Sequence, residues 1–219
     1  MKKILFMGDS ITDCSRGKGP SEKDPLLNLG NGYASFIAGR MGLEHPGEYE
    51  FVNRGISGNR IVDVYARTKR DIISLKPDYM SILIGINDVW HEVYDPEHPH
   101  GVDGPKFLKV YDLLIEELKE ELPEMKIMLM EPFVLEGPAT AERIEWFEEE
   151  TAIRAQAVRE IAAKHNLPLI PLQADLLELC EQAPETYWLA DGVHPCAPFH
   201  QYIADKWMLA FKKYCLDED

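Results

Sequence analysis

Two short segments near opposite ends of the chain hold the residue types needed for nucleophilic catalysis. Ser10 follows the apolar run Ile4–Met7 almost directly, and Asp191 and His194 lie close together near the other end. A serine hydroxyl is a weak nucleophile until an imidazole takes its proton. A carboxylate must then hold that imidazole in the right tautomer. The sequence therefore predicts acyl transfer, with Ser10 as nucleophile, His194 as base and Asp191 as the group that orients the base.

The position of Ser10 after an apolar run has a structural explanation as well as a catalytic one. Ile4–Met7 suits a buried parallel strand, and Gly8 permits a tight exit from it. The nucleophile elbow of α/β-hydrolases uses the same arrangement, although Thr12 stands where the elbow has its last glycine. Asp-Ser after a strand is also typical of a helix N-cap, with Asp9 accepting from a backbone N–H. Taken alone, this segment favours the structural explanation.

Two further strand-and-loop segments change that balance. Residues 53–59 follow a short apolar stretch, and residues 85–88 follow the apolar run 79–84. Gly58 lets a backbone N–H approach a ligand closely, and Asn87 carries an amide donor. Together with the N–H of Ser10, these groups are predicted to form an oxyanion hole. Each is an ordinary turn residue in isolation, but the four segments together favour catalysis.

In these four segments the chain resembles the SGNH hydrolases, also called the GDSL esterase superfamily. All four blocks occur in the family's order and span nearly the whole chain, although Ile11 replaces the leucine that often follows the serine. The longer strings at 8–13 and 85–90 also look like those of bacterial carbohydrate acetylesterases, such as xylan deacetylases. The matching residues are Ser10 in block 8–13, Gly58 in block 53–59, Asn87 in block 85–88 and His194 in block 191–195.

The rest of the chain alternates between strand-like and helix-like segments, which predicts one α/β domain over residues 1–219 with a parallel sheet between two helix layers. The resemblance implies a five-stranded, flavodoxin-like sheet in the order 2-1-3-4-5. That order would bring the first three strand ends, and so Ser10, Gly58 and Asn87, together. Strands are expected at 4–7, 51–53, 79–84, 126–130 and 167–170, and helices at 32–42, 61–75, 107–118, 144–162 and 199–210.

The composition of the chain limits the classes of molecule that it is expected to bind. The formal net charge of −15 disfavours nucleic acid and anionic membranes and suits a neutral small-molecule or oligosaccharide ester. The apolar run at 4–7 is too short for a signal peptide, and no stretch approaches a membrane span. The four cysteines are scattered with no C-x-x-C, which indicates neither a zinc nor a redox motif and favours the cytoplasm. A homo-oligomer is left open.

Other residues have competing interpretations. The segment 91–105 contains three histidines and several acidic residues, but its spacing favours a solvated loop, or a wall of the active site, over a metal site. Trp90 is either a substrate contact or a packing residue, and Trp188 is either part of the acyl pocket or of the core. His200 is an alternative base, but no carboxylate precedes it at a comparable spacing.

The expected function is therefore that of a serine esterase acting on short acyl esters, most simply O-acetyl groups on carbohydrates, without a metal or organic cofactor. Within the same superfamily, a lysophospholipase or thioesterase is the alternative. A flavodoxin-like nucleotide-binding protein is the alternative from another class. It is disfavoured because Asp9 and Asp13 stand where a phosphate-binding loop would follow the first strand.

Overall fold

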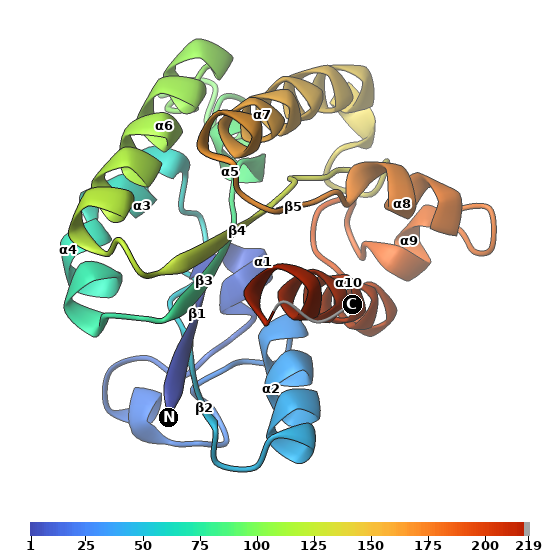
Figure 1. Cartoon of the computed structure of the whole chain (residues 1–219). Coiled ribbons are helices and arrows are strands. Elements are labelled where there is room, and N and C mark those ends of the chain that lie inside the picture. The colour runs from blue at the N-terminus through green and yellow to red at the C-terminus, as the bar shows by residue number, and fades with distance from the viewer. Residues whose placement is uncertain (217–219) are drawn as a thin grey trace.

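The predicted parallel sheet is present. A computed structural model describes residues 1–216 and has one five-stranded sheet in this part of the chain, in the order β2-β1-β3-β4-β5 (Figure 1). Residues 4–8 of β1 are buried because β1 has a neighbour on each side and helices over both faces, which explains its continuous apolar run. The strands are β1 (Lys2–Gly8), β2 (Tyr49–Asn53), β3 (Tyr79–Leu83), β4 (Lys126–Met130) and β5 (Leu169–Ile170).

Helices cover both faces of the sheet, as the alternating pattern predicts (Figure 1). Ile4 and Phe6 of β1 pack toward α2 (Tyr33–Glu44) and α10 (Ala197–Cys215). Leu5 and Met7 point to the other face, toward the remaining long helices. Those long helices are α6 (Gly104–Glu121) and α7 (Ile144–His165). The short helices are α1 (Ser10–Asp13), α3 (Ile61–Ala66), α4 (Thr68–Asp71), α5 (Ile86–Trp90), α8 (Gln173–Leu179) and α9 (Glu185–Trp188). Turns of 3-10 helix occur at Gly19–Lys23, Ile73–Leu75 and Ala141–Arg143.

The prediction of one helix over 61–75 is wrong. The segment forms α3, α4 and a 3-10 turn, and α3 ends at Arg67, whose backbone has left the helical region (φ −112°, ψ 9°). The buried guanidinium of Arg67 donates to the backbone carbonyls of Gly8 and Arg54, which ties this break to the end of β1. Tyr65, four residues after the buried Ile61, is 37% exposed. Apolar spacing alone did not reveal that a buried arginine interrupts the helix.

Three short helices were not predicted. α5 begins at Ile86, inside the segment expected to be a Gly/Asn loop, directly after Gly85 adopts φ +138°. α8 and α9 lie between β5 and α10. β5 begins at Leu169 and is shorter than expected. Within residues 1–216, no helix combines the length and the apolar composition that crossing a bilayer requires.

Candidate active site

The strand order brings the predicted site residues to one edge of the sheet. Ser10 begins α1 just beyond the carboxyl end of β1. Gly58 lies in the loop after β2, and Asn87 lies in α5, just after β3. Because β1 pairs with both β2 and β3, the three strand ends are adjacent. Ligands of open α/β sheets bind in this region, where the strand order reverses.

Ser10, His194 and Asp191 form a continuous hydrogen-bonded chain. Ser10 Oγ lies 2.9 Å from His194 Nε2, and His194 Nδ1 lies 2.7 Å from Asp191 Oδ2. The other carboxylate oxygen accepts the backbone N–H groups of Val193 and His194, at 3.0 and 2.8 Å. This tight turn requires Gly192, which has φ +98° and whose Cβ, if present, would lie 2.4 Å from Thr140 Oγ1. With Nδ1–H donated to Asp191, Nε2 is free to accept the proton of Ser10.

The pKa shifts within this hydrogen-bonded chain keep Asp191 ionised and make His194 easier to protonate. Burial raises the pKa of Asp191, but the hydrogen bonds from the His194 ring and the two backbone N–H groups outweigh it and lower the pKa to about 2. The hydrogen bond to Asp191 raises the pKa of His194, although burial opposes the shift. An ionised Asp191 thus stabilises the imidazolium that forms when His194 takes a proton.

Asp9 acts as the predicted helix cap. Its Oδ1 accepts the backbone N–H of Ile11 at 3.0 Å and so fixes the first turn of α1, which carries Ser10. The side chain is 1% exposed, and its Oδ2 has no partner among the described residues. Burial raises the pKa of Asp9 to about 7, even though the hydrogen bond from Ile11 and the nearby His194 lower it.

The loop that carries Gly58 is held in place by side chains from other elements. Asn87 Nδ2 donates to the carbonyl of Asn59 at 3.2 Å, and His91 Nε2 donates to the carbonyl of Gly58 at 2.9 Å. Gly58 itself has φ +81°, a conformation that favours glycine. The direction of the Gly58 peptide is therefore set from outside the loop, by two side chains on or next to α5. His91 gives the segment 91–105 a structural link to the site.

Asp13 holds the same loop from α1. The carboxylate is buried, and its Oδ2 accepts both the backbone N–H and the hydroxyl of Ser57, at 3.0 and 2.9 Å. Lys18 donates to the same oxygen at 2.5 Å. Burial raises the pKa of Asp13, but these hydrogen bonds lower it below its usual range. Gly55 packs so closely on this helix that a Cβ would lie 2.2 Å from Asp13 N.

Asp13, His91 and Arg67 were not recognised from the sequence as residues that position the site. Asp13 belongs to the string 8–13, and its carboxylate was considered only as an obstacle to phosphate. His91 was considered within a histidine-rich loop. Their roles depend on which loop each side chain reaches. The one signal in the sequence is that Asp13 and His91 each lie within four residues of a predicted site residue.

The structure separates the remaining candidates. His200 is buried, accepts the backbone N–H of Tyr33 at Nδ1 and lies 3.5 Å from Cys14 Sγ, so no carboxylate orients it. Burial lowers its pKa to about 4. Trp188 is buried in the core, with Nε1 donating to the carbonyl of Ala183, which favours the packing role. Trp90 is half-buried and packs against Phe147.

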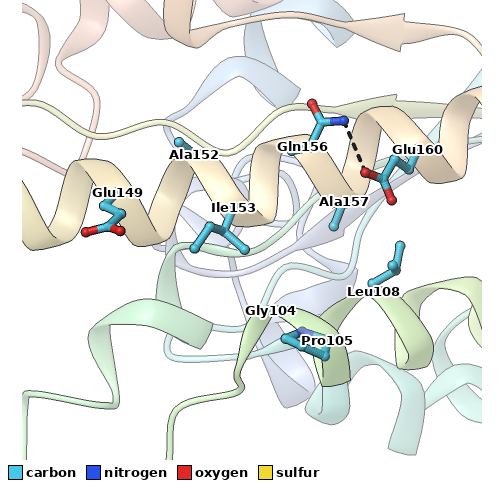
Figure 2. Close-up of a pocket in the computed structure, with 9 residues that line it drawn as sticks. All are labelled: Gly104, Pro105, Leu108, Glu149, Ala152, Ile153, Gln156, Ala157 and Glu160. Carbon is cyan, nitrogen blue, oxygen red and sulfur yellow. Dashed lines mark hydrogen bonds between the residues drawn. The ribbon is translucent and has the colours of Figure 1, made fainter.

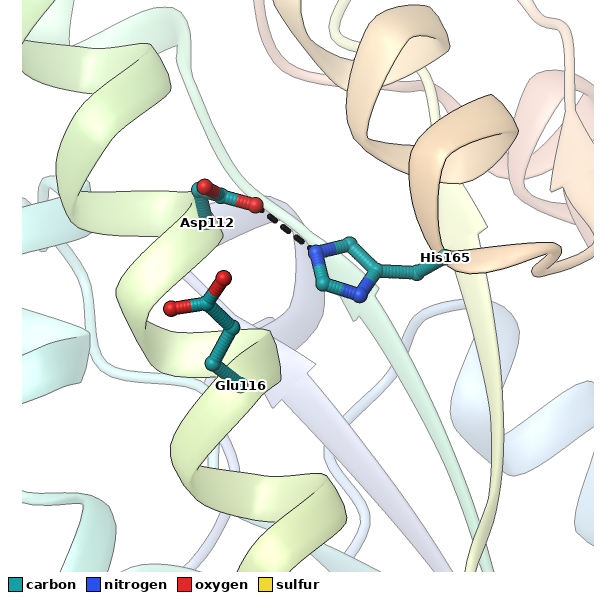
Figure 3. Close-up of side chains that lie close together, drawn as sticks. All are labelled: Asp112, Glu116 and His165. Atoms are coloured by element: carbon teal, nitrogen blue, oxygen red, sulfur yellow. Dashed lines mark hydrogen bonds and ion pairs between the residues drawn. The ribbon is translucent and has the colours of Figure 1, made fainter.

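A potential metal-binding cluster lies outside this site. Ligand atoms of Asp112, Glu116 and His165 lie within 4.8 Å of one another, on α6 and α7 (Figure 3). His165 Nε2 bonds Asp112 Oδ1 at 2.7 Å, and Lys164 Nζ bonds Asp112 and Glu116 at 2.6 and 3.0 Å. The lysine ammonium already supplies positive charge to both carboxylates, so these contacts form a surface ion-pair network.

A cavity of about 640 Å³ also lies away from the site, between α6 and α7 (Figure 2). Leu108 and Ile153 give it a largely apolar lining, and Gln156 donates to Glu160 beside it at 3.1 Å. None of the predicted catalytic or oxyanion residues lines this cavity. It therefore offers no acyl channel leading from Ser10.

Comparison with known proteins identifies the family. Residues 6–202 match the GDSL-like lipase/acylhydrolase family. An acetylxylan esterase of Geobacillus stearothermophilus is 34% identical over 93% of this chain and 90% of its own length. Its solved structure covers 95% of this chain and 93% of its own, with a TM-score of 0.82 at 31% identity. A Parabacteroides merdae protein described as GDSL-like reaches a TM-score of 0.88 at 33% identity, covering 95% of this chain and 94% of its own.

The chain therefore belongs to the GDSL-like lipase/acylhydrolase family, and it is a carboxylic ester hydrolase. Two solved structures are of catalytic mutants of the Geobacillus esterase, one altered at a serine and one at an aspartate.

The pKa values of His194 and His200 should be shifted in opposite directions. We expect His194 to titrate with a pKa above about 6.5, because Asp191 stabilises its imidazolium, and His200 with a pKa of about 4. The NMR chemical shifts of the two imidazole rings, followed as a function of pH, would measure both pKa values. The unfolded chain binds a proton at His200 more readily than the folded chain does. The free energy of unfolding that neutral His200 contributes should therefore be lost as pH falls from about 6.5 to about 4.

The variant Asp191→Asn provides the control. It removes the carboxylate, so the pKa of His194 should fall while that of His200 stays where it is. A His200 ring that titrates near its ordinary value would contradict the burial argument, and an unshifted His194 in Asp191→Asn would contradict the role of the hydrogen bond.

Proposed function

We propose that this protein is a serine esterase that removes short acyl groups, chiefly O-acetyl groups, from carbohydrates. The observation that carries the proposal is the unbroken chain from Ser10 Oγ through His194 to Asp191, at 2.9 and 2.7 Å, at the edge of the sheet where ligands bind. The catalytic serine and aspartate mutants of the related esterase support the same assignment.

The reaction runs through an acyl-enzyme. Ser10 Oγ attacks the ester carbonyl carbon while its proton passes to His194 Nε2. The bond to the alcohol oxygen then breaks, and His194 returns the proton to the leaving alcohol, which leaves the acyl group on Ser10. Water attacks this ester with His194 again as base, and the acid departs as Ser10 regains its proton. Asp191 stays ionised throughout and stabilises the imidazolium.

The negative oxygen of each tetrahedral intermediate needs preorganised donors. The N–H groups of Ser10 and Gly58 and the amide of Asn87 are the proposed set. One Asn87 N–H is used by the Asn59 carbonyl, which leaves its second N–H for the oxyanion. Asp13, which accepts from Ser57, and His91, which donates to the Gly58 carbonyl, keep the Gly58 loop in place, so the donors need little rearrangement when charge develops.

Three observations support an acetylated carbohydrate as the substrate. The 34% identical relative is an acetylxylan esterase. The loops that follow the motif strands, 12–23, 53–60 and 92–103, are rich in polar and charged residues and offer few aliphatic side chains to cover an acyl tail. A chain with a net charge of −15 is also poorly suited to anionic lipid surfaces.

Replacing Ser10 by alanine should abolish ester hydrolysis. Without the nucleophile no acyl-enzyme forms, and kcat should fall on the order of 10⁴-fold. Hydrolysis of 4-nitrophenyl acetate measures this, and mass spectrometry of the wild-type protein quenched during turnover should find the acetyl group on Ser10. Ser74→Ala, at an exposed serine in the 3-10 turn 73–75, is the matched control. A Ser10→Ala protein with a tenth of wild-type turnover would remove Ser10 from the mechanism.

The variant Asn87→Ala tests the oxyanion site. We expect kcat to fall about 10²–10³-fold with KM nearly unchanged, because the lost donor acts on charge that appears only in the transition state. Asn31→Ala, at an exposed asparagine outside the site, should retain wild-type kinetics. A raised KM at unchanged kcat would instead make Asn87 a contact to the bound substrate.

Acyl chain length separates the proposed esterase from a lysophospholipase or thioesterase. We expect acetyl esters to exceed octanoyl esters in kcat/KM, and acetylated xylan to release acetate. An apolar groove would reverse the first result, because each buried CH₂ is worth about 0.8 kcal/mol. A kcat/KM that rises steadily from acetyl to decanoyl esters would favour the lipolytic alternative, with the roles of Ser10, His194 and Asp191 unchanged.

A further inference from the structure

A cleft of about 340 Å³ lies between the segment that follows Asn87 and the segment that leads into α7. Trp90 and Tyr94 line one wall, and Thr140, Glu142 and Arg143 line the other. Its volume falls at the lower end of the range for small-molecule sites. Unlike the cavity between α6 and α7, this cleft has a mixed lining, with aromatic rings beside charged and hydroxyl groups.

Both walls are attached to the proposed catalytic groups. Trp90 lies one turn beyond Asn87 on the same short helix, α5. On the other wall, the N–H of Ala139 donates to the carbonyl of Asp191 at 3.0 Å. Gly192 and Thr140 are in such close contact that a Cβ on Gly192 would lie 2.4 Å from Thr140 Oγ1. A molecule held in the cleft is therefore bounded on one side by the helix that carries the proposed oxyanion donor, and on the other by a segment that contacts the turn at Asp191 and Gly192.

Two aromatic side chains lie on the same wall of the cleft. Trp90 is half-buried and packs against Phe147, with ring centroids 5.7 Å apart, so its orientation is fixed. Tyr94 is 71% exposed, and its ring meets that of His91 edge-on, with centroids 6.4 Å apart. Together they make a fixed ring and an exposed ring on one side of the cleft.

The opposite wall supplies unengaged charges. Glu142 and Arg143 are exposed, and within residues 1–216 neither side chain makes a hydrogen bond or ion pair. A carboxylate accepts hydrogen bonds and a guanidinium donates them in a fixed plane. This combination matches a ring whose faces are apolar C–H surfaces and whose edge carries hydroxyl groups. It matches a fatty acyl tail poorly, because the tail would leave both charges desolvated and unpaired.

We propose that this cleft binds the sugar ring that carries the acetyl ester, with Trp90 and Tyr94 against one face of the ring and Glu142 and Arg143 toward its hydroxyls. The proposal rests on the proposed function and adds the residues that select the carbohydrate part of the substrate. The acetyl group itself is handled by Ser10 and the oxyanion donors, so the cleft contributes to substrate affinity rather than to the chemical step.

The test compares two substrates that share the acetyl group and differ in the alcohol. Acetylated xylobiose fills the cleft, whereas 4-nitrophenyl acetate has no sugar. We expect Trp90→Ala and Tyr94→Ala each to lower the ratio of kcat/KM for the sugar ester over kcat/KM for the aryl ester about tenfold, through KM. Tyr214→Ala, at a 45% exposed tyrosine near the end of α10, is the matched control and should keep the wild-type ratio.

If Trp90→Ala folds poorly, a direct binding measurement on Tyr94→Ala still tests the proposal, because Tyr94 is too exposed to be needed for folding. In a Ser10→Ala background the ester is not consumed, and calorimetry should find that Tyr94→Ala weakens binding of acetylated xylobiose about tenfold. An unchanged ratio and unchanged binding in both variants would overturn the cleft while leaving the esterase proposal intact. A wild-type protein that cleaves the aryl acetate but releases no acetate from any acetylated sugar would overturn both the cleft and the carbohydrate part of the proposed function.

Discussion

The hydrogen bond between Asp191 and His194 is the interaction on which the rest of the site depends. It joins two residues in one short turn, yet it is useful only if the far nitrogen of the ring faces Ser10, 184 positions away in the sequence. The fold meets this condition by placing β1 between β2 and β3, so that α1 begins between the ends of those two strands. The same turn is held by backbone N–H groups, which keeps the carboxylate ionised and the ring in one tautomer.

The Gly58 loop shows how the remaining positioning is achieved. Its three residues, 57 to 59, have no regular secondary structure, and backbone groups of all three are bonded by side chains from other elements. Asp13 contributes from α1, and Asn87 and His91 contribute from α5 and its end. A loop fixed in this way can present an N–H group without the scatter expected of an exposed segment. The order of the site therefore comes from side-chain contacts between loops, on a frame that the sheet provides.

The sequence was sufficient for the frame and indicated the proposed triad, but it did not indicate these contacts. Apolar runs and their spacing predicted the strands, and four motif blocks identified Ser10, Asn87 and His194 because short local strings carry that signal. The break at Arg67 was missed because its guanidinium, besides pairing with Asp71, donates to residues 8, 54 and 59, which are close to it only after the sheet has formed. The link from His91 to Gly58 was missed for the same reason. Spacing along the chain reports local structure, whereas these bonds depend on which loops become neighbours.

The acidic residues around Ser10 differ in charge state because their environments differ. Asp191 has several donors, and its pKa is about 2, so it remains ionised where positive charge develops on His194. Burial raises the pKa of Asp9 to about 7 and that of Asp88 well above its usual range, and each of these two carboxyls caps the N–H of one helix. Their mutual repulsion raises the pKa of Asp88 further. Two carboxyls next in sequence to the proposed oxyanion donors are therefore biased toward the neutral form, which limits negative charge where the substrate oxygen must acquire it.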